Sequence, residues 1–219
     1  LVDPSSPDCS VFAVLQRAIF IAKASMILVD GCEIGNFLTY GLDGSEQGLI
    51  QVTGFTDTLR PHHITIRDCT IRGTKNFPFQ NGIQFSRTDE MVIDSCHITG
   101  PRFAINVGSF SKNAIIRNST IDSSGACAVI FSSGVEGVTI TGNDIMNTGF
   151  NSLQIIDQGG NIIKNVTIEG NTISSGLSNS IYCDNTENVV IKNNIIDGTA
   201  KNGVLIGGSD NEGPGCVNT

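Results

Sequence analysis

Two aspartates each follow a short apolar stretch of the sequence. Asp157 comes directly after Leu153–Ile156, and Asp184 comes directly after residues 181–183. Hydrolysis of a glycosidic bond uses two carboxyl groups about 5–9.5 Å apart. If the two stretches are neighbouring strands of a repeated structure, one or two repeats supply that separation. We therefore predict that Asp157 and Asp184 are a pair of catalytic carboxyl groups.

Similar short stretches each carry one residue that alternation would turn outward. In chain order these residues are Gln51, Gln84, Asn106, Ile130, Gln154, Tyr182 and Leu205. Amide donors and acceptors on a flat strand face suit ligands rich in hydroxyl groups, and an aromatic ring can stack on a sugar. With the cations close by, the predicted substrate-binding residues are Gln84, Asn106, Gln154, Tyr182, Arg87, Arg102 and Lys112. The alternative is a solvated sheet face or one face of a trimer.

No residue pattern predicts a metal or a cofactor. The seven cysteines contain no CxxC pair, and Cys32, Cys69 and Cys96 would offer only one sulfur per repeat. His62 and His63 stand before a strand, where the end of a long loop accounts for them more simply than metal binding or acid–base chemistry does. GxSxG, HExxH and P-loop motifs do not occur.

One phrase recurs along the chain and must position these residues. It reads NVTIEGNTI at 165–173, NVVIKNNII at 188–196 and GVTITGNDI at 137–145, with looser copies at 26–34, 63–71, 91–98 and 113–121. Three short alternating strands in each unit of about 23 residues predict a right-handed parallel β-helix of about seven rungs. The alternative, a β-sandwich, would have dissimilar strands joined by hairpins.

The residue two positions before the last isoleucine of each repeat changes along the chain. The column reads Cys32, Cys69, Cys96, Ser119, Asn143, Asn171 and Asn194. Stacked asparagines satisfy backbone groups at a buried corner, and a cysteine in the same place is a small buried hydrophobe. Free buried thiols indicate assembly in a reducing compartment such as a cytosol.

The two ends of the chain differ from the repeats. Residues 11–24 have a wide apolar face, and Asp8 or Ser10 could cap a helix there. We predict a capping α-helix within residues 1–24, the β-helix over residues 25–210, and a truncated tail over residues 211–219. The chain begins with Leu rather than Met, which leaves secretion open.

The composition excludes two classes of partner. Charged residues make up 16% of the 219 residues, and the net charge is −8. Such a chain lacks the basic face that phosphate contacts require, so we do not expect nucleic-acid binding. No run of about 18 apolar residues occurs, so we do not expect membrane insertion.

The run Leu15-Gln16-Arg17-Ala18-Ile19, followed by the rungs, resembles the pectate-lyase-like superfamily of right-handed β-helices, most of all phage tailspikes. The resemblance covers nearly the whole chain, and it implies a trimer that binds and often cleaves cell-surface polysaccharide. Polygalacturonases of the superfamily carry paired aspartates where this chain has Phe-Ala-Ile-Asn at residues 103–106. The Asp-Pro-His-Glu of alginate epimerases is also missing, so neither activity carries over.

Three functions follow from these observations. The first is recognition and cleavage of a cell-surface or extracellular polysaccharide by a hydrolase or lyase that uses Asp157 and Asp184. For elimination, a Lys or Arg base such as Arg87, Arg102 or Lys112 would replace the acid pair. The second is a glycan-binding adhesin without turnover, and the third is a structural trimeric rod. We expect the first, as a homotrimer at an extracellular or virion surface, with no cofactor.

Overall fold

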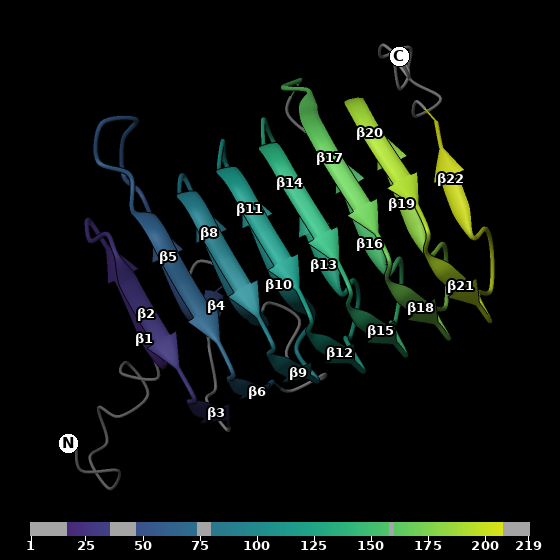
Figure 1. Ribbon diagram of the computed structural model, residues 1–219, viewed down its shortest axis with the longest axis horizontal. Helices are drawn as coiled ribbons and strands as arrows, with labels where there is room; N and C mark the ends of the chain where they lie inside the picture. The colour runs from purple at the N-terminus through teal and green to yellow at the C-terminus, as the bar shows by residue number, and fades with distance from the viewer. Residues whose placement is uncertain (1–16, 36–46, 74–79, 158–159, 208–219) are drawn as a thin grey trace, which may run out of the picture.

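The computed structural model describes residues 17–35, 47–73, 80–157 and 160–207. In these ranges the chain winds through three parallel β-sheets, each contributing one strand to a rung (Figure 1). Every strand pairs with the strand three places further along the chain, as a solenoid requires. The parallel β-helix of about seven rungs predicted from the repeat is therefore confirmed.

Sheet A is the first of the three and has eight strands. In sheet order they are β1 (Ile19–Ala22), β4 (Gln47–Thr53), β7 (Gln80–Ser86), β10 (Phe103–Gly108), β13 (Val129–Phe131), β16 (Leu153–Ile156), β19 (Ile181–Asp184) and β22 (Val204–Ile206).

Sheets B and C have seven strands each. Sheet B consists of β2 (Ile27–Asp30), β5 (His62–Arg67), β8 (Asp89–Asp94), β11 (Lys112–Arg117), β14 (Glu136–Thr141), β17 (Ile163–Glu169) and β20 (Thr186–Lys192). Sheet C consists of β3 (Glu33–Gly35), β6 (Thr70–Arg72), β9 (His97–Thr99), β12 (Thr120–Asp122), β15 (Asp144–Met146), β18 (Thr172–Ser174) and β21 (Ile195–Asp197).

The core is a set of stacked apolar columns. In sheet B, Ile66, Ile93, Ile116 and Ile140 are register partners on successive strands, and all are buried. The isoleucines of sheet C stack in the same way, from Ile34 to Ile196. Because strand side chains alternate between two faces, this register sends the intervening residues outward in columns of their own.

A single left-handed residue makes each corner between sheets B and C. The positions are Gly31, Asp68, Ser95, Asn118, Gly142, Gly170 and Asn193, with φ between 51° and 65°. Glycine adopts this conformation without strain, and Asn or Asp adopts it more readily than other residues. This requirement accounts for the Gly-Asn and Asn-Asn corners of the repeat.

The residue after each corner belongs to the predicted Cys-to-Asn column, and side chains there bond to the next rung. Asn143 Nδ2 donates to Asn171 Oδ1 at 2.9 Å, and Asn171 Nδ2 donates to Asn194 Oδ1 at 2.9 Å. Ser119 continues the column by accepting from the Cys96 backbone N–H at 3.1 Å. The column thus satisfies backbone groups that the corner would otherwise leave buried and unpaired.

Two of the three thiols in this column are buried. Cys69 and Cys96 are both free thiols and both buried. Burial raises the pKa of Cys69, and it raises the pKa of Cys96 to about 12. Both therefore stay protonated at neutral pH, and Cys96 Sγ donates to the Asp94 carbonyl at 3.4 Å. Cys9 and Cys216 lie outside the described residues.

The helix predicted within residues 1–24 is wrong where the structure describes the chain. Ile19–Ala22 form β1, which pairs with β4 so that Ile19 aligns with Ile50. Phe20 is exposed and Ile21 is buried, which is strand alternation. The apolar run fits both the helical period and the strand period. A strand is favoured because it pairs with the edge of β4 that would otherwise be free.

The structure bears on one of the predicted domain limits, the start of the β-helix at residue 25. Because β1 lies before residue 25, the rungs begin earlier than the predicted range of 25–210. Residues 1–16 and the predicted tail at 211–219 lie outside the described residues. Within the described part, no helix long and apolar enough to cross a membrane occurs.

Candidate functional site

The outer face of sheet A carries the amide column that the sequence predicted. Gln51, Gln84 and Asn106 are successive register partners, followed by Ile130 and Gln154. Tyr182 and Leu205 continue the column toward the last described rung, and Phe20 extends it by one residue at the other end. The predicted substrate contacts Gln84, Asn106, Gln154 and Tyr182 therefore lie in one line.

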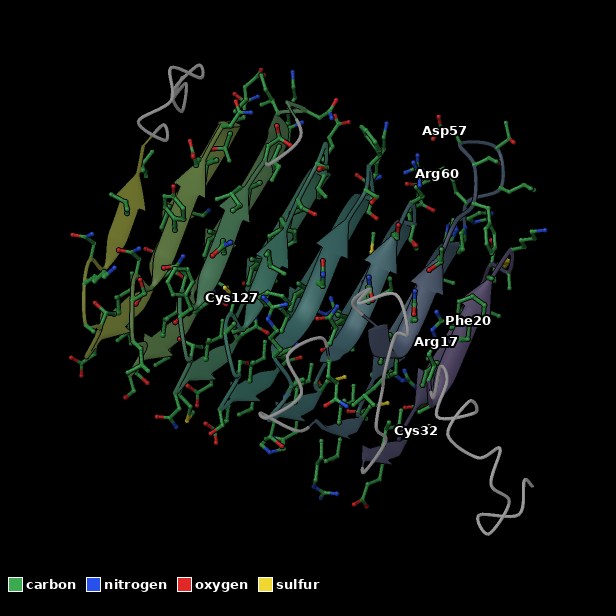
Figure 2. All side chains as sticks on the ribbon, turned by 180° about the vertical axis from the view of Figure 1, so that it is seen from behind. Arg17, Phe20, Cys32, Asp57, Arg60 and Cys127 are labelled. Carbon is green, nitrogen blue, oxygen red and sulfur yellow. The ribbon has the colours of Figure 1, made fainter. Side chains whose placement is uncertain are left out.

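A hollow of about 450 Å³ opens over the middle of this column. Asn106, Ile130 and Gln154 are among the residues that line it. The remaining lining residues are Arg102, Phe103, Ala126, Cys127, Ser132, Phe150 and Ile156. Cys127 marks its position at mid-length of the solenoid (Figure 2). A volume of this size falls within the usual range for small-molecule sites.

A second column of residues lies where the chain passes from sheet C into sheet A, and its side chains hydrogen-bond to the outward amides. Asn151 Nδ2 donates to Gln154 Oε1 at 2.9 Å, and Cys127 Sγ donates to the same oxygen at 3.3 Å. Three rungs earlier, on β7, Asn81 Nδ2 donates to Gln84 Oε1 at 3.4 Å. These bonds engage Oε1 of Gln154, a residue that lines the hollow although it is only 8% exposed.

This corner column is itself an asparagine ladder. Asn179 Nδ2 donates to Asn151 Oδ1 at 3.0 Å, and Asn202 Nδ2 donates to Asn179 Oδ1 at 3.0 Å. The corner ladder therefore fixes Asn151, which fixes Gln154. The spacing that could have revealed it is constant: each corner residue precedes its outward partner by three positions, as in Asn81/Gln84, Phe103/Asn106, Cys127/Ile130 and Asn151/Gln154.

One rim of the hollow combines a cation with aromatic rings. The Arg102 guanidinium lies over the Phe103 ring, 4.5 Å from its centroid. Phe103 is buried, whereas Phe150 is 47% exposed. Arg102 is the one charged side chain among the described residues that line the hollow. The lining therefore offers amide and hydroxyl groups, apolar ring surface and a single positive charge.

The two other predicted cations lie elsewhere. Arg87 and Lys112 line a separate depression of about 410 Å³ with Asp57, Arg60 and Phe110, beside the start of sheet B. Lys112 Nζ also lies 3.7 Å from Glu136 Oε2. Figure 2 shows Asp57 and Arg60 in the loop between β4 and β5, well away from Cys127. Of the three predicted cations, only Arg102 joins the amide column.

The predicted carboxyl pair is absent from the described residues that line the hollow, although Asp157 directly follows Ile156, which does line it, and Asp184 lies one rung further along. Asp184 aligns with Ile156, and Asp157 is one position further along the chain, so the two are offset by one residue in register. Asp184 Oδ2 accepts from the Tyr182 hydroxyl at 3.4 Å, and Asp157 Oδ2 accepts from Asn185 Nδ2 at 2.9 Å. Asp184 thus shares the outer face with Tyr182, while Asp157 is held at the corner that follows sheet A.

Comparisons with known proteins agree on the architecture. Residues 50–213 match the family described as the right-handed β-helix region. A search of the curated proteins by sequence gave no match.

Two solved structures resemble the chain with TM-scores above one half. PfbA, a surface adhesin of Streptococcus pneumoniae, has a TM-score of 0.66 at 14% identity, covering 91% of this chain and 60% of the adhesin. A double mutant of the periplasmic alginate epimerase AlgG has a TM-score of 0.59 at 14% identity, covering 85% of this chain and 48% of the epimerase. The chain thus spans less than two thirds of either relative, and likeness at this identity concerns the fold. Because the family model covers most of the chain and the three-sheet solenoid agrees with it, this protein belongs to the right-handed β-helix family.

Proposed function

We propose that the protein binds a polysaccharide along the outer face of sheet A, centred on the hollow at Asn106 and Gln154. The observation that carries the proposal is the composition of that hollow: outward amides, an exposed aromatic ring and one cation, with no acidic side chain among its described lining residues. Sugar hydroxyl groups pair with amides, which both donate and accept, and the apolar faces of sugar rings pack on aromatic side chains.

The shape of the face supports a polymer rather than a single small ligand. The column runs along the solenoid from Phe20 to Leu205, and the hollow occupies only its middle. Tyr182 adjoins Gln154 in register, so an aromatic ring and a carboxylate, Asp184, continue the face beyond the hollow. A chain of sugars lying along the solenoid would contact the predicted residues Gln84, Asn106, Gln154 and Tyr182 in turn.

The relatives support a surface setting without fixing the ligand. One is named a surface adhesin, and the other is a periplasmic enzyme named for the polysaccharide alginate. We accordingly propose an extracellular or virion surface as the location of this protein. The lining of the hollow favours binding over turnover, because the carboxyl groups needed for hydrolysis lie outside it.

Binding is tested by titrating a panel of neutral and acidic polysaccharides into the protein and measuring heat or fluorescence. We expect at least one polymer to bind the parent, and Gln154→Ala to weaken that binding about tenfold, because a ligand hydrogen bond is worth about 1.4 kcal/mol here. Thr172→Ala, at an exposed position on sheet C, is the control and should bind like the parent. If no polymer binds, or if both variants bind like the parent, the proposal is wrong.

Cleavage is the second candidate, favoured by the bond between Tyr182 and Asp184. In this version Asp157 and Asp184 act on the bound polymer at the last rungs. New reducing ends would indicate hydrolysis, and absorbance from an unsaturated product would indicate elimination with Arg102 or another cation as base. Asp184→Asn and Asp157→Asn should each abolish hydrolysis while leaving binding intact. Full activity in both variants would exclude the acid pair.

We also propose that the chain assembles as a homotrimer through sheet B. The central outward column of that sheet is Leu28, Thr65, Val92, Ile115, Thr139, Thr167 and Val190. Leu28 is 54% exposed and Val190 is 47% exposed, which leaves apolar area to cover. Assembly through sheet B would keep the amide face of sheet A accessible. Light scattering should give three times the chain mass, and a monomer would contradict this arrangement.

A further inference from the structure

A second group of ligand-type side chains lies at the start of sheet B, apart from the hollow. His62 Nδ1 is 2.8 Å from His63 Nδ1, and His63 Nδ1 is 2.9 Å from Glu90 Oε2. The three residues are exposed. Within the described ranges, this is the one group of three or more His, Cys, Asp or Glu residues whose ligand atoms all lie within 4.8 Å of one another.

The backbone brings these side chains together by breaking strand alternation. Successive residues of a regular strand point to opposite faces, yet His62 and His63 are both exposed. His63 has φ of 54°, and Glu90, in the same place on the next strand, has φ of 53°. Since His62 pairs with Asp89, His63 and Glu90 lie on adjacent rungs. Two stacked left-handed residues therefore aim an imidazole and a carboxylate at one point.

The protons available cannot satisfy this arrangement. A neutral imidazole carries a hydrogen on only one of its nitrogens, so His63 Nδ1 has at most one hydrogen. That hydrogen would have to point both at His62 Nδ1 and at Glu90 Oε2. If instead His62 Nδ1 supplies the hydrogen, the lone pair of His63 Nδ1 faces a carboxylate oxygen at 2.9 Å. A cation at the centre would accept all three lone pairs at once.

We propose that His62, His63 and Glu90 bind a divalent transition-metal ion of the Zn²⁺ class. Two imidazoles and one carboxylate are a ligand set that suits zinc and its neighbours, and they leave a fourth position open to water or a ligand. With bonds of about 2.0–2.2 Å in tetrahedral geometry, the ligand atoms would stand about 3.3 Å apart. The His62–His63 and His63–Glu90 separations of 2.8 and 2.9 Å would need to widen by only about half an ångström to reach this value.

The neighbouring cations do not oppose a metal ion, because acidic side chains already neutralise them. Arg60 Nη2 donates to Asp89 Oδ1 at 2.8 Å, and Lys112 Nζ lies 3.7 Å from Glu136 Oε2. His62 and Glu90 also line a depression of about 360 Å³, which gives the open coordination position access to solvent. The site is independent of polysaccharide binding on sheet A, so each can fail without the other.

The test is calorimetric titration of Zn²⁺ into the chelator-treated full chain. We expect one ion per chain, released again by chelator. His63→Asn and Glu90→Gln should each weaken binding at least tenfold. Asn is chosen because Asn113 has φ of 56° at the corresponding position one rung beyond Glu90, so the backbone tolerates it. His97→Ala removes the third histidine, an exposed side chain on sheet C, and should leave Zn²⁺ affinity unchanged.

Co²⁺ supplies a second readout that does not depend on affinity alone. Its visible spectrum should show tetrahedral or five-coordinate bands without the charge-transfer band of a thiolate ligand. Thermal melting of the metal-free variants checks that they are folded, and His62→Ala replaces any variant that melts early. Unchanged Zn²⁺ affinity in the folded variants, no binding to the parent, or a thiolate band that the variants retain would overturn the proposal.

Discussion

The outer faces of sheets A and B each have an uncharged central column, but on sheet B columns of charged residues flank it. On sheet A the central column consists of amides, one tyrosine and apolar residues, with no charged side chain. Sheet B has two columns of charged residues that form ion pairs between neighbouring rungs. The pairs are Asp30–Arg67, Asp94–Arg117, Lys112–Glu136, Lys164–Glu187 and Glu169–Lys192.

If the proposed function is right, the difference separates a scaffold face from a binding face. The hydrogen bond from Arg67 lowers the pKa of Asp30, and the bond to Glu187 raises the pKa of Lys164. These charges are neutralised by one another along the solenoid axis. On sheet A, in contrast, Asn151 of the corner ladder donates to Gln154 Oε1, so the central column is held by uncharged hydrogen bonds. We infer that sheet B is organised for stacking and sheet A for recognition.

The largest effect should come from neither face but from the buried column between sheets B and C. Asn143 Nδ2 donates to the carbonyls of Ile116 and Thr141 and to Asn171 Oδ1, and its Oδ1 accepts from the Ser119 backbone. Asn143→Ala would leave these groups buried without partners. The free energy of unfolding should fall by about 3 kcal/mol, measured by denaturant titration.

Thr172→Ala, an exposed change on sheet C one rung further on, is the control for Asn143→Ala. It should shift the free energy of unfolding by about 0.5 kcal/mol or less. If the two substitutions cost the same, the ladder is not what fixes the corners, and the division between a structural and a recognition face loses its basis.

The thiol end of the same column predicts a dependence on alkaline pH. The pKa of Cys96 is raised from 9.0 to about 12 in the folded protein, mainly by burial. Unfolded chains lose the thiol proton first, so stability should be full below about pH 9 and fall as pH rises toward 12. Cys96→Ser, which repeats Ser119 of the next rung, removes that titration. At pH 11 the parent should have lost on the order of 2 kcal/mol more than the variant. Parallel stability curves would contradict the assignment.

The sequence predicted the fold because the repeated residues stack on one another in successive rungs. Ile66, Ile93 and Ile116 are register partners on successive strands. The residue before each member of the Cys-to-Asn column is Gly, Asn, Asp or Ser and has a left-handed backbone. Strand order, register and the Cys-to-Asn column follow from these two signals. The sequence predicts a helix in place of the first strand because Ile19 and Ile21 lie in an apolar run that fits both structures. Only the pairing with β4 decides in favour of the strand.

The site could be predicted only in part, for a related reason. Alternation placed Asn106 and Gln154 on one outward column. It could not reveal the hollow, because Cys127 and Phe150 come from corners, where the period changes and insertions occur. Nor could it separate Arg87 and Lys112 from Arg102, since closeness in sequence to a strand does not say at which end a side chain emerges.

The single charge at the hollow sharpens the comparison between the two faces. Arg102 lies over Phe103 and lines the hollow, and the arginines Arg67 and Arg117 lie on the outer face of sheet B, where each pairs with an aspartate. Arg102→Gln should weaken binding of acidic polysaccharides about fivefold, or about 1 kcal/mol, and should flatten the salt dependence of their affinity. Binding of neutral polymers should not change. The readout is affinity at low and high salt, with Arg117→Gln as the control. An equal effect in both variants would mean that general charge, rather than the hollow, selects the polymer.

The smallest effect should come from breaking one ion pair on sheet B. Although partial burial opposes it, the pKa of Asp94 is lowered by hydrogen bonds from Arg117, Asn118 and Ser95. The folded-state pKa is depressed, so this contribution is present above the unfolded value of 3.8 and is lost as pH falls through the folded value. Asp94→Asn should therefore cost about 0.5 kcal/mol at pH 7, less at high salt, and almost nothing at pH 2, as measured by denaturant titration. Polysaccharide affinity should not change. A loss of affinity in Asp94→Asn would show that sheet B also takes part in recognition, and the contrast between the two faces would fail.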